Sequence, residues 1–212
     1  MWGPRLLAVA PFFSPPVHLP PMSPHYRIQA AIAVKEAILA DEALLDRLGQ
    51  ATAACVATFR NRGKALFCGN GGSAADAQHL AAELSGRFYL DRPPLFAEAM
   101  HVNTSFLTAV ANDYGYDHAF SRLTTGMARP GDVLFLLSTS GNSRNVLAAA
   151  VAGKRAGCTL IAMTGASGGE LGHLVDILIN IPSTDTPRIQ EGHMLLGHIL
   201  CEDVERQLFG TP

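Results

Sequence analysis

The sequence feature that most restricts the fold is a repeated alternation between short apolar segments and longer stretches with helical periodicity. Short apolar runs separated by amphipathic helices are typical of a parallel sheet that is covered by helices on both faces. With 212 residues and 48% hydrophobic content, the chain has the right size for one such domain. We therefore predict an α/β fold, a three-layer α-β-α sandwich with a five-stranded parallel sheet. The predicted strands are residues 64–69, 96–102, 132–138, 159–164 and 176–182, and the helices between and after them include residues 73–85, 145–156 and 189–208.

The first 24 residues differ in composition from the rest of the chain. Pro11, Pro15 and Pro16 interrupt the apolar run that follows Arg5, which argues against a signal peptide or a membrane span. We predict a proline-rich disordered extension over residues 1–24, with Met22 as an alternative start, and a single domain over residues 25–212. Residues 26–61 have helical periodicity and are expected to form an N-terminal helical arm of one or two helices. Its apolar surface predicts packing against another subunit, and hence a homo-oligomer.

Charge and cysteine content exclude several classes of function. A net charge of −2 provides no long-range attraction for nucleic acid or for an anionic membrane. The four cysteines lie far apart and form no CxxC pair, which is typical of reduced thiols in a cytoplasmic protein. An anion site must therefore be built from backbone N–H groups and hydroxyls. The cysteines are Cys55, Cys68, Cys158 and Cys201.

The segment GNGGS, residues 69–73, follows the first predicted strand. Its three glycines allow close backbone approach, and Ser73 with Asp76 predicts a capping box at the start of a helix. A helix start behind such a loop favours an anion, but an ordinary capped turn explains the pattern equally well. The segment also matches a degenerate dinucleotide signature, GxGxxA. Because Glu98 falls in the middle of the second strand rather than at its end, we expect no nucleotide cofactor.

The segment STSGNS, residues 138–143, is the stronger phosphate candidate. It follows the third predicted strand, and hydroxyls together with backbone N–H groups can surround phosphate oxygens without a lysine. The chain has no GxxxxGK[ST] motif, which argues against a nucleoside triphosphate with magnesium. A polar turn capped by Ser143 is the alternative. The hydroxyls belong to Ser138, Thr139, Ser140 and Ser143.

Two helices carry side chains that are suited to proton transfer or metal binding. His79 and Glu83 are spaced i, i+4 and project from one helix face. Such a pair is commonly a surface salt bridge, but its position after a phosphate-type loop raises acid–base catalysis or metal ligation as the alternative. Gln190, His193 and His198 lie on the otherwise apolar last helix, and His193 alone is best explained by a structural role.

A further polar segment, ANDYGY, follows a short helix after the second predicted strand. We expect it to form a loop that contains Asn112 and Asp113. Asp113 either binds sugar hydroxyls or caps the next helix.

Four segments in this order, residues 68–88, 110–116, 138–143 and 188–198, resemble the phosphoheptose isomerases of the SIS (sugar isomerase) phosphosugar-binding fold. The resemblance covers about residues 26–210. It implies conversion of sedoheptulose 7-phosphate to D-glycero-D-manno-heptose 7-phosphate through an enediol, the first step of heptose nucleotide synthesis for lipopolysaccharide or related glycans. It also implies a cytoplasmic homotetramer with active sites between subunits.

The same resemblance implies roles for individual residues. Glu83 and His198 would be the catalytic acid–base pair, and zinc would be held by His79, Glu83, Gln190 and His198. Gln190 and His198 are eight residues apart, about 12 Å along a helix, so one ion reaches both only if Gln190 extends inward or another subunit contributes. Some relatives have an acidic residue where this chain has Pro187. The implied substrate-binding residues are Asn70, Gly71, Gly72, Ser73, Glu83, Asn112, Asp113, Ser138, Thr139, Ser140, Ser143 and Gln190.

The main alternative is a non-catalytic SIS protein that binds the bacterial replication initiator. Such relatives share the glycine loop but lack the side chains equivalent to Glu83 and His198, and they have TRGNS where this chain has TSGNS. Because the chain keeps Glu83, His198 and Ser140, we favour the enzyme. A phosphosugar-sensing transcription regulator would usually carry a helix-turn-helix domain ahead of the sugar domain, which we do not expect in the segment before the first strand.

Overall fold

The computed structural model describes residues 23–210 and contains a five-stranded sheet in which every pairing is parallel. The strand order is β2-β1-β3-β4-β5. The predicted fold class is therefore confirmed. The predicted extension, including Met22, lies outside the described residues except for Ser23 and Pro24, which cap and begin the first helix. The strands are β1 (Ala65–Gly69), β2 (Ala97–Ala99), β3 (Val133–Leu137), β4 (Thr159–Thr164) and β5 (Ile177–Asn180).

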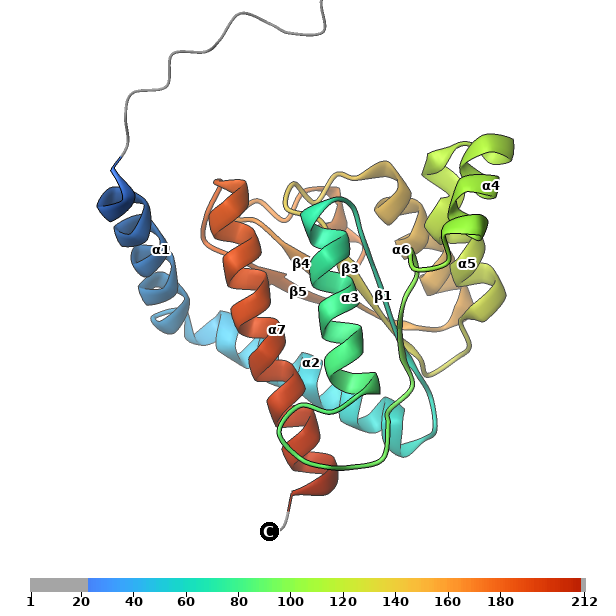
Figure 1. The fold of residues 1–212 in the computed structure, drawn as a ribbon, viewed down its shortest axis with the longest axis horizontal. Helices are drawn as coiled ribbons and strands as arrows, with labels where there is room; N and C mark the ends of the chain where they lie inside the picture. The colour runs from blue at the N-terminus through green and yellow to red at the C-terminus, as the bar shows by residue number, and fades with distance from the viewer. Residues whose placement is uncertain (1–22, 211–212) are drawn as a thin grey trace, which may run out of the picture.

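Helices cover both faces of this sheet, because residues that alternate along each strand point to opposite sides. Phe67 and Phe135 belong to one core with α2, α3 and α7, whereas Leu66 and Leu134 belong to a second core with α5 and α6. Figure 1 shows α3 and α7 in front of the sheet, with α4, α5 and α6 grouped apart from them. The helices are α1 (Pro24–Leu39), α2 (Glu42–Arg60), α3 (Gly72–Ser85), α4 (Thr104–Tyr114), α5 (Ala119–Met127), α6 (Arg144–Ala156) and α7 (Thr186–Phe209).

The predicted helical arm consists of two helices that differ in burial. Helix α1 ends at Leu39, and Asp41 caps α2, since its side chain accepts a hydrogen bond from the Leu44 N–H at 2.9 Å. In α2, side chains such as Leu44 and Leu48 are buried in the chain's own core, so this half of the arm is part of the domain. In α1 only Ile38 is buried, and Figure 1 shows this helix projecting away from the sheet.

Three local predictions were wrong. Strand β2 has three residues instead of the seven predicted, because this edge strand pairs only with Ala65, Leu66 and Phe67 before the chain turns toward α4. The predicted capping box at Ser73 does not form, since Gly71 is the N-cap of α3 and Ser73 is buried inside its first turn. The ANDYGY segment is not a loop at its start: Asn112 and Asp113 lie in the last turn of α4. None of the helices in residues 23–210 combines the length and the apolarity that a membrane crossing requires.

Candidate active site

The two glycine- and hydroxyl-rich loops lie next to each other at one edge of the sheet. Strands β1 and β3 are neighbours, and Gly69 at the end of β1 pairs with Leu137 at the end of β3. The loops that follow, residues 69–73 and 138–143, therefore leave the sheet side by side, where ligands of parallel sheets usually bind. We describe these loops as the phosphate edge of the molecule.

The first loop is held by a network of amides around Asn70. The side chains of Asn70 and Asn145 exchange two hydrogen bonds, at 2.8 and 2.9 Å, and the Tyr116 hydroxyl donates to Asn70 Oδ1 at 2.9 Å. Asn145 is buried in the first turn of α6, directly after the second loop. The network thus ties both loops together. Sequence reasoning assigned no role to Asn145 or Tyr116, although Asn145 closely follows the STSGNS segment and Tyr116 ends the ANDYGY segment.

Glycines in the first loop allow close approach to α7. Gly71 has a φ of +56°, which a residue with a side chain rarely adopts. A Cβ atom on Gly72 would overlap the Gln190 amide, so the start of α3 touches the first turn of α7. The predicted substrate ligands Gly71, Gly72 and Gln190 are therefore neighbours.

The second loop leaves the start of α6 without a side-chain cap. Ser143 is the N-cap residue of α6, but its hydroxyl lies 2.9 Å from the hydroxyl of Ser138 and bonds no helix N–H. The N-cap residues of α3 and α7 likewise provide no side-chain hydrogen bond, whereas α1, α2 and α4 are capped by Ser23, Asp41 and Asn103. Helix α5 is also uncapped, as it continues from a 3-10 turn. Three helices that begin around the phosphate edge thus offer free N–H donors and a positive dipole end.

A cavity of about 300 Å³ opens beside the second loop. Across this cavity, Thr139 and Ser140 face residues 165–167 after β4 and a second group at the start of α7, which consists of Ser183, Thr184 and Thr186. Sequence reasoning missed the second group, although the run STDT (183–186) after the last strand repeats the hydroxyl pattern of STSGNS. The hydroxyl-bearing residues added by the structure are Ser167, Ser183, Thr184 and Thr186.

His79, Glu83 and His198 converge on one point between α3 and α7, and we call them the His–Glu–His triplet. His79 Nε2 lies 3.1 Å from Glu83 Oε1 and 3.0 Å from His198 Nε2, and one ligand atom from each residue lies within 4.8 Å of the others. A single ring N–H can point at only one of two acceptors. The convergence of three nitrogen and oxygen donors therefore fits a divalent cation such as zinc.

Gln190 lies at a different level of the helix pair from the His–Glu–His triplet. Its amide is next to Gly72, whereas Gly197 packs on Leu80 further along both helices, where a Cβ on Gly197 would be 2.6 Å from Leu80 Cδ2. Helices α3 and α7 therefore run in the same direction, and His198 lies eight residues, about 12 Å of helix, beyond Gln190. Zinc binding by Gln190 therefore stays a prediction. It would require that another subunit supplies this Gln190 to the His–Glu–His triplet.

Asn112 and Asp113 are exposed at the end of α4, where the Asn112 amide donates to Asp113 at 2.8 Å. Neither side chain caps the next helix. Tyr116, which follows closely in the chain, reaches Asn70, and the contact of Asn112 and Asp113 with the sugar stays a prediction.

Two titratable groups near the site are shifted by burial. Burial raises the pKa of Asp76 to about 6, against the opposing effect of His79, and one carboxylate oxygen of Asp76 is buried without a hydrogen-bond partner among the described residues. Burial lowers the pKa of His193 to about 4, although its Nε2 hydrogen bond to the Thr164 carbonyl at 3.1 Å acts in the other direction. His193 is completely buried and connects α7 to β4, which agrees with the structural role expected for it.

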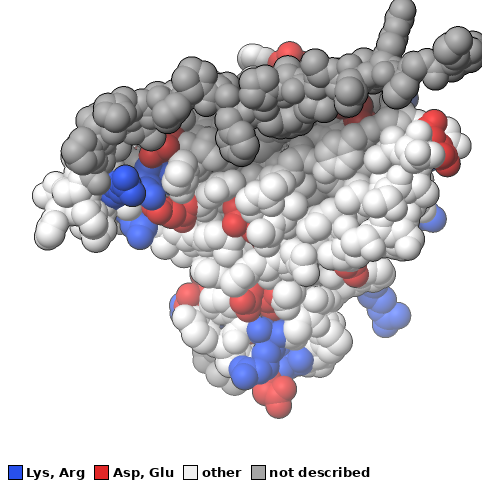
Figure 2. Space-filling view, turned by 45° about the horizontal axis from the view of Figure 1, so that its top comes forward, with Lys and Arg blue, Asp and Glu red and all other residues white. Residues whose placement is uncertain are grey.

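The surface charge agrees with the low net charge of the sequence. On the face that Figure 2 shows, Lys and Arg alternate with Asp and Glu in small groups, and no extended basic area is visible there. The four cysteines are buried and free, as expected for reduced thiols.

The sheet order and the two loops define an SIS domain, and residues 26–165 match the family model described as "SIS domain". The chain is 55% identical to phosphoheptose isomerase from Mycobacterium tuberculosis over 178 residues, which covers 84% of this chain and 91% of that protein. Its fold matches the structure of phosphoheptose isomerase from Neisseria gonorrhoeae with a TM-score of 0.80 and 42% identity, covering 85% of this chain and 96% of that one. The equivalent match for Francisella tularensis has a TM-score of 0.82 and 35% identity, covering 86% and 96%.

The chain belongs to the phosphoheptose isomerase family and is a sugar phosphate isomerase. The resemblance on which the sequence interpretation depended is thus confirmed, as is its conclusion that the protein is an enzyme. The non-catalytic alternative is not supported.

Proposed function

We propose that the protein converts sedoheptulose 7-phosphate to D-glycero-D-manno-heptose 7-phosphate in the cytoplasm, as the first step of heptose nucleotide synthesis. The observation that carries this proposal is the convergence of His79, Glu83 and His198. An aldose–ketose isomerisation needs a base and an acid on the same two carbons, and the His–Glu–His triplet supplies both. The names of its relatives support the choice of a heptose phosphate.

The phosphate of the substrate is held at the phosphate edge. The free N–H groups at the start of α6 and the hydroxyls of residues 138–143 offer hydrogen-bond donors and a favourable dipole to a dianion. Net protein charge contributes little, since it is −2. Asn70 and Gly72 of the first loop, together with Gln190, which adjoins Gly72, are proposed to contact the sugar.

Glu83 and His198 carry out the proton transfers. The Glu83 carboxylate takes the proton from the carbon next to the carbonyl, which forms the enediol, and returns a proton to the neighbouring carbon. His198 moves protons between the two oxygens. Zinc bound by His79, Glu83 and His198 would polarise the carbonyl oxygen, and the nitrogen and oxygen donor set suits that ion.

The active site is proposed to be completed in a homotetramer. Within one chain the His–Glu–His triplet lies about two helix turns away from the level of Gly72 and Gln190. A second subunit that contributes its phosphate edge or its Gln190 would close this gap. Exposed apolar side chains on α1 provide a surface for such contacts: Tyr26, Ile28, Ile32 and Leu39.

We expect the purified protein to elute as a tetramer, and light scattering coupled to gel filtration measures the mass directly. Replacing Ile28 and Ile32 together by Ser should shift the mass toward dimer or monomer, because apolar contact area would be lost. The exchange of the exposed Val151 of α6 for Ser is the control. A tetramer that survives the double substitution would show that α1 is not the interface.

The proposed reaction is tested with the wild-type protein. Incubation with sedoheptulose 7-phosphate should yield the aldoheptose 7-phosphate. Chromatography of the sugar phosphates measures the formation of this product. Sedoheptulose without phosphate is the control and should react far more slowly, since it lacks the group that the loop at residues 138–143 binds. A folded protein that leaves sedoheptulose 7-phosphate unchanged with and without zinc would contradict the proposal.

Ser143→Ala tests the phosphate contact separately from the chemistry. We expect KM for the heptose phosphate to rise about tenfold or more, because a hydrogen bond to a charged group contributes about 1.5–3 kcal/mol. The value of kcat should change little, since Ser143 does not touch the reacting carbons. Steady-state kinetics measures both, with Ser85→Ala on α3 as the control. A fall in kcat with an unchanged KM would place Ser143 elsewhere in the reaction.

A further inference from the structure

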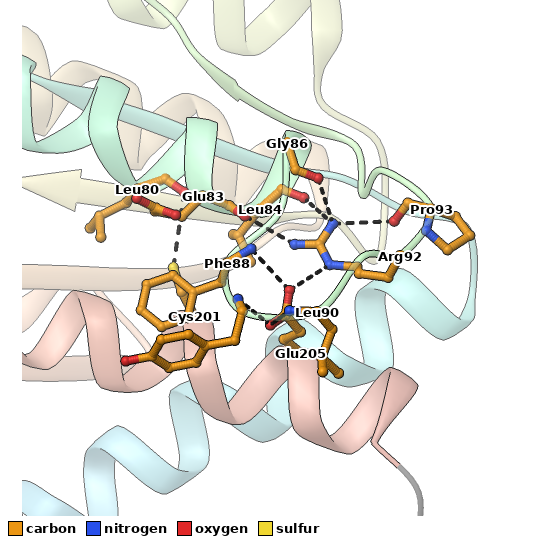
Figure 3. A network of polar contacts seen from close by, with 11 residues as sticks. Leu80, Glu83, Leu84, Gly86, Phe88, Leu90, Arg92, Pro93, Cys201 and Glu205 are labelled. Atoms are coloured by element: carbon orange, nitrogen blue, oxygen red, sulfur yellow. Dashed lines mark hydrogen bonds and ion pairs between the residues drawn. The ribbon is translucent and has the colours of Figure 1, made fainter.

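A buried ion pair closes the far end of the α3–α7 helix pair (Figure 3). Arg92 lies in the segment after α3, and Glu205 lies in α7, with their side chains 2% and 1% exposed. Arg92 Nε donates to Glu205 Oε1 at 3.0 Å. Both side chains are long and charged, and such residues are rarely buried to this extent unless they are paired. Neither belongs to the site described above.

Arg92 binds the end of α3. Its Nη2 donates to the Glu83 carbonyl at 2.9 Å, and its Nη1 donates to the Leu84 carbonyl at 2.7 Å and the Gly86 carbonyl at 3.2 Å. Glu83 and Leu84 lie in the last turn of α3, where a helix leaves its carbonyls without intrahelical partners and where a cation is also favoured. Arg92 therefore fixes the backbone of Glu83 itself.

Glu205 binds the loop that follows α3. Its carboxylate accepts hydrogen bonds from the N–H groups of Phe88, Tyr89 and Leu90, at 3.0, 2.7 and 2.8 Å, in addition to the bond from Arg92. Burial alone would raise the pKa of Glu205, but the three N–H donors and Arg92 outweigh it and lower that pKa. The carboxylate is thus ionised and fully paired.

The same contacts reach the other side of the His–Glu–His triplet. The Phe88 ring, whose N–H binds Glu205, lies 5.8 Å from the ring of His198, measured between ring centres. Glu205 lies two helix turns beyond His198 on α7. One ion pair therefore sets the position of Glu83 on α3 and of the ring that packs against His198 on α7.

We infer that Arg92 and Glu205 are positioning residues that hold Glu83 and His198 at the separation needed for proton transfer. They touch neither substrate nor metal, and they act through the end of α3 and through Phe88. The expected loss of kcat depends on the proposed function. The expected displacement of Glu83 does not.

Glu205→Gln and Arg92→Lys test this role. Each keeps the shape of the side chain approximately but disrupts the pairing. We expect kcat for the heptose phosphate to fall about 10-fold to 100-fold with KM nearly unchanged, since misplacing a catalytic group costs this much and the phosphate edge is not altered. The matched controls are Glu202→Gln and Arg206→Lys, also on α7, which should keep wild-type kcat.

A double-mutant cycle separates positioning from general destabilisation. In a Glu83→Gln background, Arg92→Lys should lower kcat by less than threefold, because Arg92 binds the backbone of Glu83 and the carboxylate that it positions is already absent. Independent losses that multiply would overturn the inference, as would a wild-type kcat in both single variants.

A crystal structure of Arg92→Lys tests whether Arg92 positions Glu83, even if the protein does not act on the heptose phosphate. The Glu83 carboxylate should move by more than about 1 Å from His79 and His198, a shift large enough to matter for catalysis. A His–Glu–His triplet that keeps its spacing in this variant would overturn the inference independently of any substrate.

Discussion

Replacing Glu83 by Gln should lower kcat for the heptose phosphate by about 100-fold or more, because the amide cannot accept the proton that a general base must take. The change is nearly isosteric, so the packing of α3 should be kept. Glu83 is only partly buried and lies 3.1 Å from His79, and its removal leaves no large cavity. His198→Ala should cause a similar loss through the acid step.

Initial rates at saturating substrate measure this effect. Glu42→Gln, an exposed residue at the start of α2, is the control and should behave like the wild type. Circular dichroism at matched concentrations shows whether the variants are folded. If Glu83→Gln retains more than a tenth of the wild-type kcat, Glu83 is not the base, even if the reaction itself is correct.

Acidification should destabilise the protein through His193. Its pKa in the fold is about 4 and below its usual value of 6.5, so between these values the unfolded chain binds a proton that the folded chain does not. The contribution of the neutral, buried His193 to the free energy of unfolding is therefore fully present above about pH 6.5 and decreases as the pH falls toward 4. At pH 5 the loss from this residue is about 2 kcal/mol. Asp76 has a raised pKa and acts in the opposite direction over part of this range.

The contribution of His193 is obtained by comparing the wild type with His193→Leu. Urea unfolding at pH 7.5 and pH 5, at one protomer concentration, gives the pH dependence for each protein. The variant should lose less stability on acidification than the wild type, by about 2 kcal/mol. The Thr164 carbonyl still accepts a bond from the Ile181 N–H at 2.9 Å in the absence of His193, so the variant should fold. Equal pH dependence in both proteins would contradict the assignment.

Local sequence patterns predicted most strands of the parallel sheet and the shared helix face of His79 and Glu83. Buried parallel strands are continuous apolar runs, so β1, β3 and β4 were visible as such. The i, i+4 spacing of His79 and Glu83 alone places them on one helix face, and their 3.1 Å contact follows from that spacing. His198 joined them only through the family resemblance, since its partner His79 lies 119 residues away in the sequence.

Features that depend on tertiary packing were missed or misassigned. Arg92 and Glu205 are 113 residues apart, and neither lies in a motif. Ser73 fits the capping-box pattern, but the backbone of Gly71 at φ +56° moves the helix start and places Ser73 in the core. The hydroxyls of residues 183–186 line the cavity only because the fold places the start of α7 opposite Thr139. In each case the deciding contact is made by a residue that is remote in sequence.

The uncapped starts of α3, α6 and α7 link ligand binding to folding. In the absence of ligand, the N–H groups at these three helix ends are left to water. In the proposed function, a phosphate oxygen would accept the hydrogen bonds that the N-cap side chains of these helices do not, and any ligand that binds the folded state alone raises its stability. Substrate binding should therefore stabilise the fold. We expect the melting temperature to rise with inorganic phosphate and to rise further with the heptose phosphate.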